Sequence, residues 1–235
     1  MSTVALTADR RTRSRLLRSS GATPEISYVG RGTAVVTSAL SITGVMPAGI
    51  VANDYLIFVV AHATSSDVAS GTNCSGSGGA WTRLIEWANT TPRNVGAIFA
   101  KKYNGSEGAP TANMNASAKS MRGQVYAFRG VDPTTAIDQA AAIQVTTTAV
   151  APSMTTTFAG GLSFQVIRTP NNNNPWVSAI GSGHTLAGSG SDFSNVELGV
   201  AYAKLVAPVT TQPTWTVPTP ASGTTHTIAL ALRPA

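Results

Sequence analysis

The stretch "VGAIFAKKYNGSEG", residues 95–108, shows how this chain is organised. Its first part, Val95 to Tyr103, has the length of a strand and is rich in β-branched and aromatic residues. Its second part, "NGSEG", consists almost entirely of residues that favour turns. The stretch therefore predicts a strand that ends in a turn, and the same alternation recurs along the chain.

Further strand-like segments share this character. They are "AVVTSALSI" (34–42), "DYLIFVVAHA" (54–63), "WTRLIEWA" (81–88), "RGQVYAF" (122–128), "GLSFQVI" (161–167), "VELGVAYAKLV" (196–206), "PTWTV" (213–217) and "THTIALAL" (225–232). Clusters of Gly, Pro, Asn and Ser separate them, for example "CSGSGG" (74–79), "TPNNNNP" (169–175) and "AGSGSD" (187–192). With no convincing amphipathic helix after residue 20, the pattern predicts an all-β fold, an antiparallel, jelly-roll-like β-sandwich.

Composition limits the class of protein. Charged residues make up 11% of the 235 residues, well below the usual share of about 25%, and the polar character comes mainly from Ser, Thr and Asn. Cys74 is the only cysteine, so neither an intrachain disulfide nor a zinc site with several thiolates can form. No apolar run of about 18 residues and no secretory signal is present, which argues against a membrane span and against export.

The positive charge belongs mostly to the N-terminus. Residues 1–18 contain five arginines and one aspartate, a net +4 out of the +6 of the whole chain. A nucleic-acid-binding domain spreads its Lys and Arg over one face, and the rest of this chain does not. The sequence thus predicts a basic N-terminal arm, residues 1–27, ahead of a body formed by residues 28–235.

Within the body, segments repeat at a nearly constant spacing. "AIFAKKYNGSEGAPTANM" aligns with "VAYAKLVAPVTTQPTWTV" at an offset of 103 residues, which places Phe99 on Tyr202. "GQVYAFRGV" aligns with "HTIALALRPA" at 104, which places Arg129 on Arg233, and Leu56 aligns with Leu162 at 106. This predicts two duplicated halves, about 33–131 and 140–235, that pack either as two sandwiches or as one sandwich with pseudo-twofold symmetry.

The strand "GQVYAF" ends in "RGVDPTTAID", a charged break that resembles the approach to an active site. The second copy also ends this strand with an arginine, Arg233, so the charged break indicates the end of a strand. We expect Tyr126 and Phe128 to face one side, Arg129 to emerge into solvent, and Asp132 with Pro133 to start a turn. Neither Asp132 nor Asp138 has a histidine or second carboxylate nearby in sequence.

These segments together resemble a known family. "NDYLIFVVAHA", "GGAWTRLIEWA", "VGAIFAKKY" and "VYAFRGVDPTTAID" are similar to the β-sandwich virion proteins of tailed bacteriophages, commonly labelled minor tail proteins. The resemblance covers about residues 28–235 and rests on motifs that mark fold positions. In this chain Asn53 stands in place of the family's glycine before Asp54, Ala80 in place of the glycine before Trp81, and Phe128 in place of the tyrosine before Arg129. The resemblance implies a structural role in a virion, with no catalytic residues to carry over.

No catalytic or metal-binding pattern is found in the sequence. His62, His184 and His226 form no metal-binding motif, and we expect surface or hydrogen-bonded histidines at His62 and His226. The loop "SGSGG", 75–79, leads into a strand and is expected to be a flexible connection and not a phosphate cradle. Isolated acids give no support to glycoside hydrolysis. The prediction is a protein that is not an enzyme and that binds no cofactor or metal.

The expected function is that of a structural virion protein made in the host cytoplasm, either a minor tail or a tail-tip or fibre-associated component. Its expected partners are other virion proteins and further copies of itself. Two alternatives stay open: a head decoration protein, or a lectin-like adhesin that binds host surface glycans. For the adhesin, Trp176 would offer an aromatic platform beside the candidate ligand loop of Asn171, Asn172, Asn173 and Asn174, while Trp81, Trp87 and Trp215 are expected in the core.

The basic arm is expected to dock on partners. Its arginines would form charge-assisted contacts with carboxylates of a neighbouring subunit. They are Arg10, Arg11, Arg13, Arg15 and Arg18. An unstructured tail is the alternative, and direct DNA binding by so short an arm would be weak and steeply salt-dependent.

Overall fold

The computed structural model describes residues 25–64, 73–90, 93–113, 118–146, 148–169, 179–181, 183–191, 197–206, 208–216 and 225–235. These residues form strands and connections and contain no helix, and every strand pair in the named sheets is antiparallel. The predicted all-β antiparallel fold is therefore confirmed.

Two large sheets form the centre of the molecule. The first has the order β1 (Ser27–Arg31), β10 (Ala118–Arg129), β4 (Tyr55–Thr64), β8 (Arg93–Lys102) and β7 (Thr82–Thr90), with β2 (Val35–Thr37) beside β10 at the β1 edge. The second has the order β11 (Ile137–Thr146), β19 (Thr225–Leu232), β13 (Gly161–Thr169), β16 (Glu197–Leu205) and β15 (Thr185–Ser191). All residues of the first sheet precede those of the second along the chain.

The two large sheets have the same strand order. In each, the strand that comes first along the chain lies at one edge and pairs with the strand that comes last. The strands that align in the sequence, β4 with β13, β8 with β16 and β10 with β19, occupy equivalent places in their sheets. The repeat is thus also a repeat of strand order, and its origin in a duplication stays a prediction.

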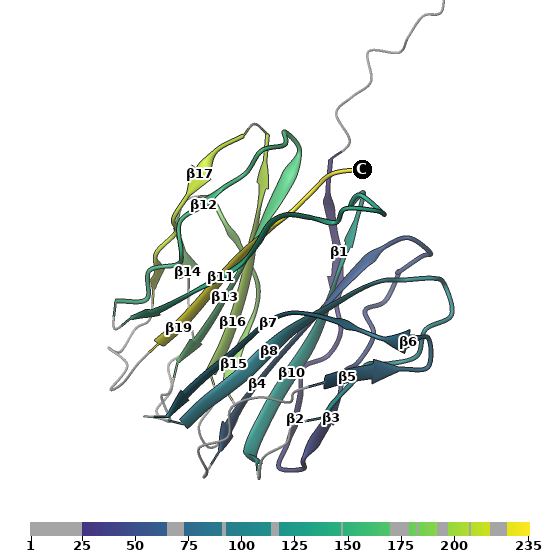
Figure 1. The fold of residues 1–235 in the computed structure, drawn as a ribbon, viewed down its shortest axis with the longest axis vertical. Coiled ribbons are helices and arrows are strands. Elements are labelled where there is room, and N and C mark those ends of the chain that lie inside the picture. Colours follow the sequence, from purple (N-terminus) through teal and green to yellow (C-terminus); the bar gives the residue numbers. More distant parts are fainter. Residues whose placement is uncertain are drawn as a thin grey trace, which may run out of the picture.

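Small sheets cover the outer faces of the large ones (Figure 1). Strands β3 (Ser41–Thr43), β9 (Thr111–Asn113), β5 (Asn73–Gly76) and β6 (Gly79–Ala80) form one, and its Cys74 and Ala112 share a core with Phe58 and Val60 of β4. On the other side, β14 (Ala179–Ile180) pairs with β18 (Trp215–Thr216), and β12 (Met154–Thr155) pairs with β17 (Thr210–Thr211). Each half therefore has its own outer core, and the two large sheets share the central one.

The central core is rich in aromatic side chains from both sheets. The rings of Phe128 and Phe164 meet edge to face at 5.7 Å between centroids, and Tyr126 approaches Phe164 at 5.8 Å. Tyr28 of β1 stacks on Tyr202 of β16 at 4.7 Å. As expected, Tyr126 and Phe128 lie on one face of their strand, since side chains two apart share a face.

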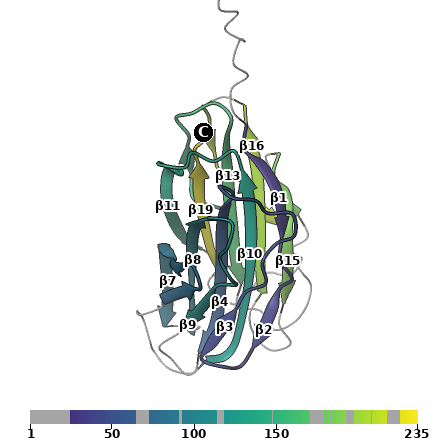
Figure 2. The same cartoon turned by 90° about the vertical axis from the view of Figure 1, so that its right-hand side faces the viewer.

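The large sheets also contact each other at their edges. The first edge strand, β1, lies against β16, while its counterpart in the second sheet, β11, contacts β7. Figure 2 shows these two edges on opposite sides of the molecule. The first strands of the two sheets thus lie at opposite ends of the interface between the sheets.

Several sequence predictions need correction. Residues 34–42 do not form one strand, because the chain leaves β10 after Thr37 and pairs with β9 from Ser41 onward. The expected loop "SGSGG" is a small hairpin of β5 and β6, and "AGSGSD" is largely the edge strand β15. Strand β11 was not predicted at all.

Candidate functional site

The residues predicted to contact partners lie outside the described residues. This applies to the arm residues Arg10, Arg11, Arg13, Arg15 and Arg18 and to the candidate ligand loop, Asn171 to Asn174 with Trp176. Both assignments stay predictions. The other tryptophans are described, and Trp81, Trp87 and Trp215 are all buried, so their expected place in the core is confirmed.

The conspicuous polar contact of the body joins two of the segments that carry the family resemblance. Arg129, at the end of β10, donates from Nε to Asp54 Oδ1 and from Nη2 to Asp54 Oδ2, both at 2.8 Å. Asp54 precedes β4 and is buried, while the Arg129 side chain is 47% exposed. The carboxylate also accepts a bond from the backbone N of Val51 at 2.8 Å. A bidentate pair of this kind fixes both geometry and charge, so it holds the turn before β4 against the end of β10.

A shallow pocket of about 370 Å³ lies beside this pair. Its lining combines the turn 51–54 with Lys102 of β8, Arg129 and Pro133. Asn53 adopts a left-handed backbone, with φ of 77°, at the point where the turn enters the pocket wall. The lining is largely apolar, and of its two cations Arg129 is paired with the Asp54 carboxylate.

The second half uses its equivalent arginine differently. At an offset of 106, Gly160 stands where Asp54 would be, so Arg233 has no such partner. Instead, Arg233 Nε lies 3.3 Å from Asp132 Oδ2, and the guanidinium lies 4.1 Å above the ring of Phe158. The two arginines, equivalent in sequence, thus lie at two strand ends with different partners.

Asp132 itself forms the predicted turn. Its Oδ1 accepts bonds from the backbone N of Thr134 at 2.8 Å and of Thr135 at 2.9 Å. These bonds, and to a smaller extent the charge of Arg233, lower the pKa of the Asp132 carboxyl. Asp138 accepts a bond from the backbone N of Thr157 at 2.8 Å and from the Thr157 hydroxyl. Both carboxylates therefore organise connections between strands.

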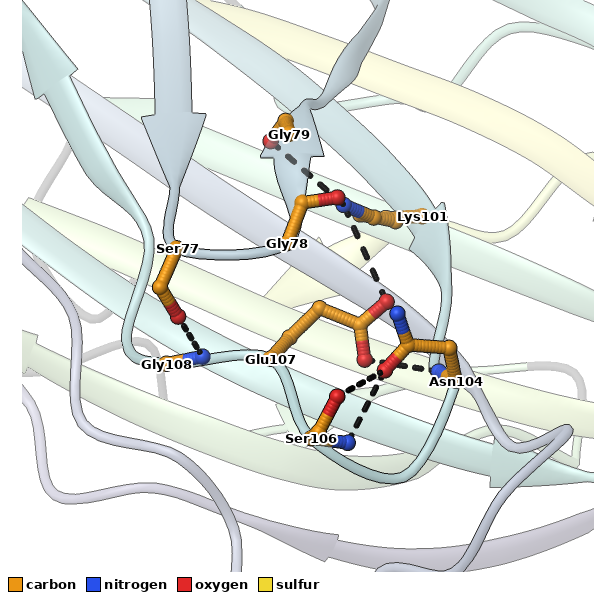
Figure 3. A network of polar contacts seen from close by, with 8 residues as sticks. All are labelled: Ser77, Gly78, Gly79, Lys101, Asn104, Ser106, Glu107 and Gly108. Atoms are coloured by element: carbon orange, nitrogen blue, oxygen red, sulfur yellow. Dashed lines mark hydrogen bonds and ion pairs between the residues drawn. The ribbon is translucent and has the colours of Figure 1, made fainter.

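A second polar network joins the β5–β6 turn to the β8–β9 connection (Figure 3). The ammonium of Lys101 donates to the Gly78 carbonyl and lies 3.7 Å from Oε1 of the buried Glu107. The other oxygen of Glu107 accepts a bond from the Asn104 backbone N at 2.6 Å. A Cβ at Gly78 would lie 2.2 Å from Glu107 Cγ, so only glycine allows this approach. The connection expected at residues 75–79 is thus the turn of a hairpin, and Lys101 contacts its carbonyl groups.

The histidines lie in different environments. His226 is fully buried in β19, and neither of its ring nitrogens is hydrogen-bonded, contrary to the expectation of a surface or hydrogen-bonded side chain. Burial and the nearby charge of Arg168 lower the pKa of His226 to about 4. His62 is buried in β4, and His184 Nε2 lies 3.1 Å from the Ser163 hydroxyl. Among the described residues, no three His, Cys, Asp or Glu side chains are close enough together to hold a metal ion.

Sequence reasoning missed three arginines that lie near the seam between the large sheets. Arg168 of β13 is fully buried, Arg122 of β10 is 7% exposed, and Arg31 ends β1. The alternation of "SFQVIRT" contains the signal for Arg168, because it lies two residues beyond Val166 on the inward face. In β10, Arg122 and Gln124 likewise alternate with Tyr126 along the strand, so they lie on the same inward face as Tyr126.

No family model, no curated protein and no solved structure matches this chain. In the part of the chain that the structure describes, no helix is long and apolar enough to cross a membrane.

Proposed function

We propose that this protein is a non-enzymatic structural component of the virion of a tailed bacteriophage, a minor tail or tail-tip component. The observation that carries the proposal is the Asp54–Arg129 pair. It joins the "NDYLIF" and "FRGVD" segments, on which the resemblance rests, through two bonds of 2.8 Å. The motif residues are thus used to build the sandwich, as expected where a motif marks fold positions.

Two further motif residues support this interpretation. Trp81 packs in the outer core of the first half, with its ring 6.4 Å from that of Phe58. Asp132 organises the turn between the halves. Charged residues make up only 11% of the chain, and the centre of a protein–protein interface is typically poor in charge, which suits docking onto other virion proteins and onto copies of itself.

The test is to look for the protein in purified particles. A phage that carries a tagged copy of this chain is purified through two density gradients, and mass spectrometry with gold-labelled antibodies locates the tag. We expect a stoichiometric component at the tail or tail tip. Its presence in the lysate and absence from particles would overturn the proposal, and label on the capsid surface would favour a head decoration protein.

The proposed docking element is the basic arm. Deletion of residues 1–20 is expected to leave the melting temperature of the isolated protein unchanged, because the sandwich core lies within residues 26–232. The same deletion is expected to reduce incorporation into particles. A matched variant with Arg10, Arg11, Arg13, Arg15 and Arg18 changed to Gln separates charge from length. Equal incorporation of all three proteins would contradict a docking role for the arm.

A further inference from the structure

A second pocket, of about 340 Å³, lies at the seam between the two large sheets. Its walls come from the connection between β1 and β2, residues 32–34, from Arg122 and Gln124 of β10, and from Ser189 of β15, with Arg31 beside them. It therefore combines residues from both halves of the chain. None of these residues takes part in the Asp54–Arg129 pair or in the pocket next to it.

The pocket wall is held by hydrogen bonds. The chain leaves β1 after Arg31 and enters β2 at Val35. Between them, the backbone N of Gly32 donates to the Val125 carbonyl at 2.9 Å, and Gln124 Nε2 donates to the Gly32 carbonyl at 2.8 Å. These two bonds fix the backbone between β1 and β2, which forms one wall of the pocket.

A glycine on the facing sheet makes room for a guanidinium. Gly188 lies at a bulge in β15, where the register with β16 shifts. A Cβ at Gly188 would lie 2.5 Å from Arg31 Nη1, 2.8 Å from the Tyr126 hydroxyl and 3.0 Å from Gln124 Oε1. Arg31 therefore reaches across to β15, and the residue stays exposed to solvent.

The pocket is positively charged. Arg31 and Arg122 both line it, and the charges of both oppose the rise in the pKa of Tyr126 that burial causes. Arg31 forms no ion pair with any residue of the described part of the chain. The hydroxyls of Thr33 and Ser189 form no hydrogen bond with any described residue either. One exposed guanidinium and two hydroxyls are thus available to a ligand, with a second guanidinium in the wall.

We propose that this pocket binds a carboxylated sugar unit of the uronic-acid type. An arginine offers a planar pair of donors that matches a carboxylate, and hydroxyl groups suit the ring hydroxyls of a sugar. The pocket volume lies within the range of small-molecule sites. A concave site with a nearly buried arginine in its wall favours a compact ligand over a flat protein surface. This activity goes beyond the proposed structural role and does not depend on it.

Calorimetry and amide NMR with the full chain at low salt test the proposal. The probe is a galacturonic acid tetramer, with the neutral galactose tetramer and glutarate as comparisons. We expect binding of the uronate, at least tenfold weaker binding of glutarate, and none of the neutral sugar. The amides of Gly32, Gly188 and Ser189 are expected to shift on titration.

Three variants locate the site. Arg31→Gln is expected to weaken uronate binding about tenfold, as expected for the loss of a charge-assisted contact. The control Lys102→Gln removes one exposed charge at the other pocket and is expected to change binding less than twofold. Thr33→Glu places a competing carboxylate at the exposed rim, and it should abolish binding without lowering the melting temperature.

Three results would overturn the proposal. They are no measurable binding of the uronate, unchanged affinity in Arg31→Gln and Thr33→Glu, and equal binding of glutarate and uronate. Each can be observed in the isolated protein, so its outcome is separate from whether the chain is found in virions.

Discussion

Asp54 is the buried partner in a contact between strands that are far apart in sequence, and its carboxylate accepts bonds from both Arg129 and Val51. Asp54→Asn removes the negative charge and replaces one of the two acceptor oxygens by an NH2 group. The remaining oxygen cannot accept bonds from Arg129 Nε, Arg129 Nη2 and the Val51 backbone N together. We expect the free energy of unfolding to fall by about 2 kcal/mol, as for hydrogen bonds to charged groups. Chemical denaturation measures this.

A matched control is the exposed pair of Lys204 and Glu25, whose charged atoms are 3.7 Å apart. Lys204→Gln is expected to change the free energy of unfolding by less than about 0.5 kcal/mol, because exposed pairs contribute little. Equal effects of the two substitutions would show that Asp54 contributes no more than a surface charge does.

His226 makes the stability depend on pH. Its pKa is about 4 in the folded protein and about 6.5 in the unfolded chain. Between these values the unfolded chain binds more protons, so the free energy of unfolding decreases as the pH falls from 6.5 to 4. We expect the melting temperature to fall over this range, and His226→Leu to flatten that part of the profile. A His226→Leu profile as steep as that of the parent, or an equal flattening in His184→Gln, would assign the effect to other groups.

At the scale of the strand, Gly96 shows how the β7–β8 pair is packed. It lies opposite Trp87, and a Cβ at Gly96 would be 2.1 Å from Trp87 Cζ2 and 2.6 Å from the Val60 carbonyl. Gly96→Ala would displace a buried indole, and overpacking of this kind costs about 1–3 kcal/mol. We expect that loss in the free energy of unfolding, together with a shifted Trp fluorescence maximum.

The control is Gly181→Ala. The nearest atom to a Cβ there is the Thr214 carbonyl oxygen at 3.8 Å, an ordinary contact, so the free energy of unfolding should change little. If Gly96→Ala and Gly181→Ala have the same free energy of unfolding, the Trp87 indole can shift to accept the added methyl group, and the close packing at Gly96 does not contribute to stability.

The strands that sequence predicts best are those with apolar side chains on both faces. β4, β13 and β19 were expected nearly at their observed bounds, because each is covered by sheet on both sides. β15, with its sequence "TLAGSGS", was missed because Gly and Ser have low β-propensity, and pairing with β16 determines its conformation. The seam pocket could not be predicted, since it depends on the approach of Arg31 to a strand that itself was missed.

At the scale of the whole molecule, the two large sheets share one core, so the halves are expected to unfold together. Phe164 of β13 contacts Tyr126 and Phe128 of the other sheet. Phe164→Ala should lower the free energy of unfolding by about 3–5 kcal/mol. Because the loss is shared, hydrogen exchange of amides in β4 should accelerate as much as exchange in β13.

The comparison variant is Ile180→Ala, in the outer core of the second half. Its effect on hydrogen exchange should be larger near β14 than in β4. Unchanged protection of β4 in Phe164→Ala would show that the halves are separate cooperative units.

The place of the last strand of each large sheet has a consequence for synthesis on the ribosome. β10 lies between β1 and β4, and β19 lies between β11 and β13, so each sheet contains a gap until its final strand has been translated. The first sheet can close once residue 129 has left the exit tunnel, but its inward face, with Ile57, Val59 and Phe128, stays uncovered while about a hundred further residues are made. The nascent chain thus carries a completed first sheet with an exposed apolar face, which is prone to aggregate. The yield of the protein in cells should therefore depend on chaperones that cover this face until β19 emerges.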